Sequence, residues 1–220
     1  MFSSKQLVRL VAPLFGEQFL VVLVGITDTF MVAHAGESAV SGVALVDTIS
    51  YLVVAVFGAL CAGGSILASQ YSGSGDRARV SLAARLLMGS TLAIALAMAA
   101  LVLLCGNGLL ALIFGRVEPE VMRSAREYFA LIGCSFPFLA AYSAAAALFR
   151  SQGNSMVTLA ASLLMNGLNV AGNAWFIYGK GMGAAGAALA TLIARGGAAA
   201  LLCVLLAKSG MLAAPQKQPV

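Results

Sequence analysis

The sequence predicts an all-α integral membrane protein built as a bundle of six transmembrane helices, and its composition is the first reason. Hydrophobic residues make up 61% of the 220 residues, and charged residues make up only 10%. The mean hydropathy is +0.97. A soluble domain carries about 25% charged residues. So few charges cannot cover a water-exposed surface, which excludes a soluble globular domain.

The second reason is the length of the apolar segments. A helix needs about 20 mostly apolar residues to cross a hydrocarbon core of about 30 Å. Six segments qualify, and they cover 7–33, 41–69, 81–105, 122–149, 156–179 and 183–207. Abundant Ala and Leu, without two-residue alternation, favour helices over a transmembrane barrel. We therefore expect a six-helix lobe over 1–208, followed by a polar tail or the start of a linker over 209–220.

The first apolar segment is predicted to be a retained helix. It is too long for the hydrophobic region of a signal peptide, and it carries Pro13, Glu17 and Asp28. An even number of spans then places both chain ends on one side of the membrane.

The positive charges favour a cytoplasmic location for that side, and a bacterial inner membrane is the expected compartment. The side of the termini would hold Lys5, Arg9, Arg77, Arg79, Arg85, Arg150, Lys208 and Lys217, and the other side Arg116, Arg123, Arg126 and Lys180. Eight against four follows the positive-inside rule. The net charge of +5 is thus explained by topology and requires no nucleic-acid partner.

Polar residues within spans are costly and point to function. Glu17 and Asp28 are three helical turns apart and share a face of the first helix, with Gln18 beside Glu17. Asp28 is either an interfacial carboxylate or a cavity carboxylate that binds a cation or a proton. Glu17 is either a packed acid that is protonated or paired, or a cleft residue. For Asp47, near the start of the second segment, we favour compensation of the helix dipole.

The fifth segment carries a polar stripe. Its members follow steps of four, three and four: Ser162, Asn166, Asn169 and Asn173. Such amides can join helices or line a polar cavity, and they can hydrogen-bond to Asp28. In the sixth segment, Thr191 precedes Arg195 by one turn. An arginine at this depth needs a partner, and Glu17 is the candidate.

No enzyme motif is present, so we expect neither catalysis nor a cofactor. Gly-x-Ser-x-Gly, His-Glu-x-x-His and the phosphate-binding glycine loop are all missing. The four cysteines lie in apolar segments without a Cys-x-x-Cys pair, which favours small buried residues over disulfides or metal ligands. A sodium ion at Asp28 is the one metal expected.

Three strings resemble one family in order along the chain. The run 28–36, which begins Asp-Thr and follows Pro13 by fifteen residues, resembles the end of helix 1 in multidrug and toxic compound extrusion (MATE) transporters. The loop 150–154 resembles their Arg-x-Gln-Gly motif, and 169–191 resembles their helix 5–helix 6 signature. The resemblance implies two six-helix lobes around a central cleft, of which this chain would supply the N-terminal lobe.

The resemblance also implies a function. Family members export organic cations and other amphipathic drugs, driven by inward flow of protons or sodium ions. Carried over residue by residue, the ion-coupling site would be Asp28, Asn169, Asn173 and Thr191. Glu17, Gln18, Asn166 and Arg195 remain candidates for the cleft or for structure, and Pro13 for a hinge. The position of Asn173 is often aspartate in relatives, which leaves the choice of ion open.

Two alternatives stay open beside a drug antiporter. A flippase for lipid-linked precursors shares the broad architecture, but its cleft should be cationic, and Arg195 is the only candidate here. The second alternative follows from the length of the chain, which is about half that usual in the family. In that case the chain is a non-transporting fragment that needs a second six-helix lobe, joined covalently or supplied separately.

Overall fold

The computed structural model describes residues 4–115 and 117–212, with side chains from residue 11 onward. It confirms the predicted bundle, because six of the helices in this part of the chain are long and apolar enough to cross a membrane. The helices are α1 (Ser4–Ala33), α2 (Glu37–Gly73), α3 (Arg77–Phe114), α4 (Pro119–Ser151), α5 (Ser155–Asn173) and α6 (Gly183–Lys208).

The helix ends extend beyond several of the predicted segments. α3 continues nine residues past the predicted end at 105, because Gly106, Asn107 and Gly108 do not break a helix that contains no proline. It stops at Gly115, whose φ of 64° suits glycine. α5 passes into a π-helical turn, η1 (Ala174–Gly179), which the sequence did not reveal. The residues outside the description include 213–220 of the predicted tail, Arg116, and the side chains of Lys5 and Arg9.

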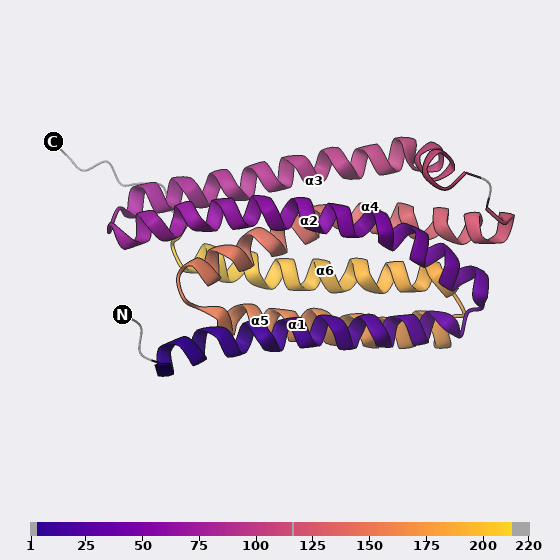
Figure 1. Cartoon of the computed structure of the whole chain (residues 1–220), viewed down its shortest axis with the longest axis horizontal. Coiled ribbons are helices and arrows are strands. Elements are labelled where there is room, and N and C mark those ends of the chain that lie inside the picture. Colours follow the sequence, from indigo (N-terminus) through magenta and orange to yellow (C-terminus); the bar gives the residue numbers. More distant parts are fainter. Residues whose placement is uncertain (1–3, 116, 213–220) are drawn as a thin grey trace.

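The helices run side by side (Figure 1). α4 is the most buried of them, because it packs against α6, α2 and α3, and 61% of its most apolar stretch is buried. Pro119 starts α4 at the position where proline is best tolerated. On the α2 side, Gly42 allows close approach, since a Cβ there would lie 2.8 Å from the Ala125 backbone nitrogen.

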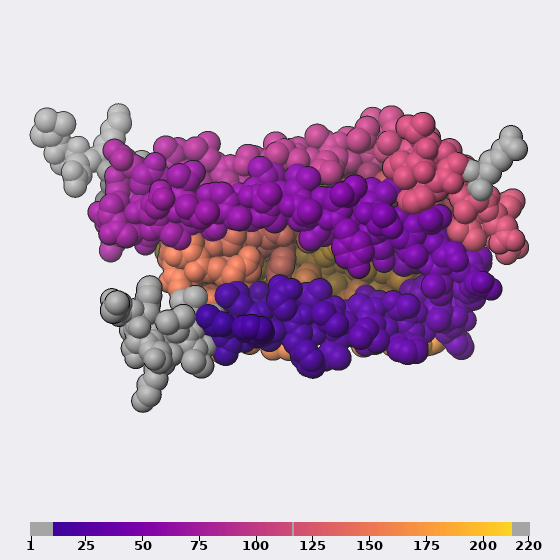
Figure 2. All heavy atoms as spheres, viewed as in Figure 1, coloured from indigo at the N-terminus to yellow at the C-terminus, as the bar shows by residue number. Residues whose placement is uncertain are grey.

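α1 is the most peripheral helix. Its main neighbour is α5, and its contacts with α2 and α6 are slight. Only 11% of its most apolar stretch is buried. Large side chains such as Phe15, Phe19 and Phe30 are exposed on it, as suits a surface that faces lipid or another transmembrane lobe. The space-filling view shows a hollow between α1 and α2, floored by later helices (Figure 2).

The cysteines are less uniform than predicted. Cys61 is buried, but Cys105 is exposed, and Cys134 and Cys203 are half-buried. The expectation of four buried residues is therefore wrong for Cys105, because a transmembrane bundle also exposes apolar side chains on its lipid-facing surface. All four are free thiols.

Candidate ion and substrate site

A cavity of about 470 Å³ lies between α1 and α2. α1 supplies one wall and α2 the facing wall, and side chains of α4, α5 and α6 contribute to its lining. Its polar side chains are Asp28 and Thr29 of α1, Asp47 and Tyr51 of α2, Tyr128 of α4, Asn173 of α5 and Thr191 of α6. Three of the four residues predicted for ion coupling thus line one cavity.

The core of the site is a short chain of hydrogen bonds across three helices. Asn173 Nδ2 donates to Asp28 Oδ1 at 2.6 Å, which joins α5 to α1. The Asn169 amide and Thr191 Oγ1 form a hydrogen bond of 3.1 Å, which joins α5 to α6. Asn169 and Asn173 are one turn apart on the predicted polar stripe, and both are buried. The stripe therefore faces the interior and meets Asp28, as the sequence analysis allowed.

The Asn169 amide also faces Asp28. In the orientation that satisfies both of its polar atoms, Nδ2 donates to Asp28 Oδ1 at 2.8 Å and Oδ2 at 3.1 Å, and the amide oxygen accepts from Thr191 Oγ1 at 3.1 Å. Asp28 is therefore surrounded by two amide donors of α5.

Asp47 belongs to this cavity, and the sequence interpretation of it is wrong. α2 begins at Glu37, so Asp47 lies nearly three turns inside the helix, beyond the first turn where the dipole acts. Its Oδ1 accepts a hydrogen bond from Tyr128 Oη at 3.2 Å. The misplaced start of the second segment hid this residue, and an acid well inside an apolar span was the signal that could have found it.

Glu17 and Arg195 do not meet, so the predicted pair is wrong. Glu17 is buried, accepts a hydrogen bond from the Thr158 hydroxyl, and lies 3.5 Å from Arg150 Nη1. Arg195 instead donates from Nη1 to Ser135 Oγ at 2.6 Å on α4. Arg150 comes from the 150–154 motif, so that motif ties the ends of α4 and α5 to α1.

The other candidates lie outside the cavity lining. Asn166 is buried and donates to Ser162 Oγ at 3.4 Å within α5. Gln18 is exposed, and no hydrogen bond to it is seen in the described residues. Pro13 is buried inside α1, which remains helical through it.

The Asp28 carboxylate faces amide N–H donors, and other oxygens belong to the same site. The Thr191 side chain lines the cavity, and Asn173 Oδ1 is buried without a hydrogen-bond partner among the described residues. Oxygen ligands of this kind suit a hard cation. Within the described residues no group of three His, Cys, Asp or Glu side chains could hold a metal ion, so a softer transition-metal centre gains no support.

Known proteins match most of the chain. The MatE family model matches residues 13–175. A probable multidrug resistance protein NorM of Thermotoga maritima is 30% identical over 211 residues, which are 93% of this chain and 44% of that protein. An uncharacterized transporter, YisQ of Bacillus subtilis, is 28% identical over 187 residues, covering 83% and 41%. The chain spans less than half the length of these relatives.

Solved structures agree in fold. A crystal structure of MATE in complex with MaD3S has a TM-score of 0.89 at 20% identity, covering 98% of this chain and 49% of that one. The outward-facing conformation of a multidrug resistance MATE family transporter has a TM-score of 0.87 at 21% identity, covering 96% and 46%. With six membrane-spanning helices and a family match over most of its length, the chain belongs to the MatE family of multidrug and toxic compound extrusion transporters.

Proposed function

We propose that the chain is the N-terminal lobe of a proton- or sodium-coupled antiporter that exports organic cations and amphipathic drugs. One observation carries the proposal. Asp28 lies at membrane depth on a cavity, hydrogen-bonded to an amide at 2.6 Å, and no ion pair to it occurs among the described residues. A bare carboxylate there is costly, so the site favours a proton or a cation.

Binding of that ion would change the contacts of the amides. A bare Asp28 carboxylate accepts hydrogen bonds from Asn173 and Asn169, and a proton or cation on Asp28 would compete with these two donors. Occupancy would therefore alter how α5 connects to α1. A ligand that binds one arrangement better than the other shifts the balance between them.

α1 is the element that this change would move. It packs mainly on α5 and only lightly on α2 and α6, so its position depends on the few polar contacts with α5. Pro13 lacks a backbone N–H and weakens the helix ladder in its first half. We therefore assign Pro13 the role of hinge.

The substrate would occupy the same cavity. Asp28, Asp47, Tyr51 and Tyr128 line it, and carboxylates combined with aromatic rings favour organic cations. Ion and substrate would then compete for Asp28, and one would displace the other. Two carboxylates also argue against a pyrophosphate-bearing lipid precursor, since Arg195, the one candidate cation, bonds to Ser135 and does not line the cavity.

Transport would need a second six-helix lobe, because the chain covers 44% of a multidrug resistance relative and one lobe forms one wall of a central cleft. The second lobe would be joined covalently to this chain or supplied as a separate chain. The membrane would be the bacterial inner membrane, with the termini in the cytoplasm. Dye accumulation in cells that express this chain alone, and together with a separate second lobe, distinguishes a fragment from an independent transporter.

Export of a cationic dye by the two-lobe protein tests the proposal. Asp28→Asn should abolish ion-driven export. Thr27→Ala is the matched control, because the Thr27 hydroxyl bonds only to its own helix, at Leu23 O, 2.9 Å away, and it should export normally. Unchanged export by Asp28→Asn would refute the ion-coupling role.

A further inference from the structure

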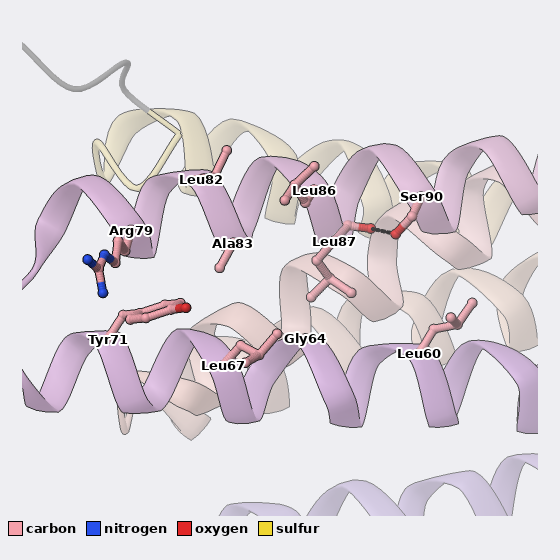
Figure 3. A pocket seen from close by; sticks show the side chains of 10 residues that line it. All are labelled: Leu60, Gly64, Leu67, Tyr71, Arg79, Leu82, Ala83, Leu86, Leu87 and Ser90. Carbon is pink, nitrogen blue, oxygen red and sulfur yellow. Dashed lines mark hydrogen bonds between the residues drawn. The ribbon is translucent and has the colours of Figure 1, made fainter.

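A second groove lies between α2 and α3, away from the Asp28 cavity (Figure 3). Its volume is about 500 Å³, within the range of about 300–1,000 Å³ typical of small-molecule sites. Leucines form its walls: Leu60 and Leu67 of α2, and Leu82, Leu86 and Leu87 of α3. We call this feature the α2/α3 groove.

The groove has the length of one membrane leaflet. It runs along α2 from Leu60 to Tyr71, eleven residues or about 16 Å of helix, and half of a hydrocarbon core is about 15 Å. The Tyr71 end adjoins the short connection between Gly73 and Arg77, where the chain turns at the end of the bundle. The groove therefore opens at the end of the bundle where α2 turns into α3.

Its floor is closed by helix packing, and its rim is open. A Cβ added at Gly64 would lie 2.6 Å from a Leu87 methyl group, so the two helices touch there. Leu67, Leu82 and Leu86 remain 48%, 51% and 64% exposed. The result is an apolar channel along the exposed surface of α2 and α3.

A cationic group stands at the interfacial end. The Arg79 guanidinium lies 5.8 Å from the centre of the Tyr71 ring and 3.1 Å from Asp76 Oδ2. These contacts fix it beside the mouth while its side chain stays 67% exposed. With Arg77 two residues before it, the start of α3 carries more positive than negative charge.

We propose that the α2/α3 groove binds an anionic phospholipid, with the lipid phosphate on Arg79 and one acyl chain along the leucines. An acyl chain gains little from leaving the surrounding tails, which are equally apolar. Selectivity must then come from the headgroup. Arg79, Arg77 and Tyr71 supply charge and hydrogen-bond donors at the end of the groove nearest the α2–α3 connection. A lipid with net negative charge is attracted to that positive charge more strongly than a zwitterionic lipid is. This site is independent of the function proposed for the Asp28 cavity.

Photolabelling tests the proposal. The whole chain is placed in phosphatidylcholine vesicles that contain a trace of phosphatidylglycerol or phosphatidylcholine, each with a photoreactive group on its acyl chain, and the labelled residues are mapped by mass spectrometry. We expect labels on Leu67, Leu82 and Leu86, with about fivefold more from phosphatidylglycerol, the preference that one arginine near a charged lipid provides.

Substitutions separate charge from shape. Arg79→Gln should reduce phosphatidylglycerol labelling to the phosphatidylcholine level, and Arg79→Lys should keep most of the preference. Ala83→Phe, which fills the groove, should remove labelling by both lipids. Arg123→Gln is the matched control, because Arg123 is also exposed and lies 3.1 Å from a carboxylate, that of Glu127, but does not line the groove.

Two results would overturn the proposal. One is equal labelling of the leucines by the two lipids in the unaltered chain. The other is a phosphatidylglycerol preference that survives Arg79→Gln in protein whose circular dichroism and monomeric elution match those of the parent.

Discussion

Glu17 and Asp28 lie on one face of α1, three turns apart, yet their surroundings differ. Glu17 is buried, accepts from Thr158 and pairs with Arg150 at 3.5 Å. Asp28 opens onto a cavity and accepts a hydrogen bond from the Asn173 amide. A carboxylate with a fixed cation already has its charge balanced, whereas one among amides still lacks a positive partner. We therefore infer that Glu17 fastens α1, and the proposed exchange of an ion falls to Asp28.

Ion binding should separate the two carboxylates most strongly. Trp175, the single tryptophan, lies two residues after Asn173, at the start of η1, and its fluorescence can report changes at the site. We expect Asp28→Asn to lower the affinity for sodium ions or protons, read from this fluorescence, at least about tenfold, because the charged partner of the ion is lost. Glu17→Gln should leave the affinity within about twofold. Equal losses of ion affinity in the two variants would contradict the difference in role between Glu17 and Asp28.

The free energy of unfolding should depend more on Glu17 than on Asp28, the opposite of the order expected for ion affinity. Glu17→Gln removes a charged acceptor from Thr158 and Arg150, and we expect the free energy of unfolding in detergent to fall by about 2 kcal/mol. Arg150→Gln should cost less in the Glu17→Gln background than alone, because the two residues share one ion pair. Additive losses in this double-mutant cycle would refute the fastening role.

A substitution at Asn173 tests the ion-binding role of Asp28 from the neighbouring helix. Asn173→Asp would put a second carboxyl group where an amide now lies 2.6 Å from Asp28. Two carboxylates this close cannot both remain ionised without a bound positive charge. We expect tighter cation binding, on the order of tenfold, in the Trp175 fluorescence assay. Weaker binding in Asn173→Asp would show that the amide itself is needed for ion binding.

Periodicity and composition account for the parts of this picture that the sequence predicted. The six helices followed from apolar length, and the inward direction of Asn169 and Asn173 followed from their helical spacing. Contacts between helices did not follow, since spacing does not say which helix faces which. Arg195 was matched with Glu17 by depth alone, although Arg150 and Thr158 lie nearer to Glu17. Asp47 was missed because the predicted start of its helix was displaced toward it.

Gln18 provides the smallest expected effect and tests where the Glu17 contacts end. It follows Glu17 directly, but its exposed side chain points away from the buried pair. Adjacent helical residues face different directions, so Gln18→Ala should change the unfolding free energy by no more than about 0.5 kcal/mol and leave ion binding unaltered. A large loss of export in the two-lobe protein, with both of these quantities unchanged, would locate Gln18 at the cleft shared with the second lobe. That result would give α1 three roles on two faces, with fastening at Glu17 and ion exchange at Asp28 on one face and cleft contact at Gln18 on the next.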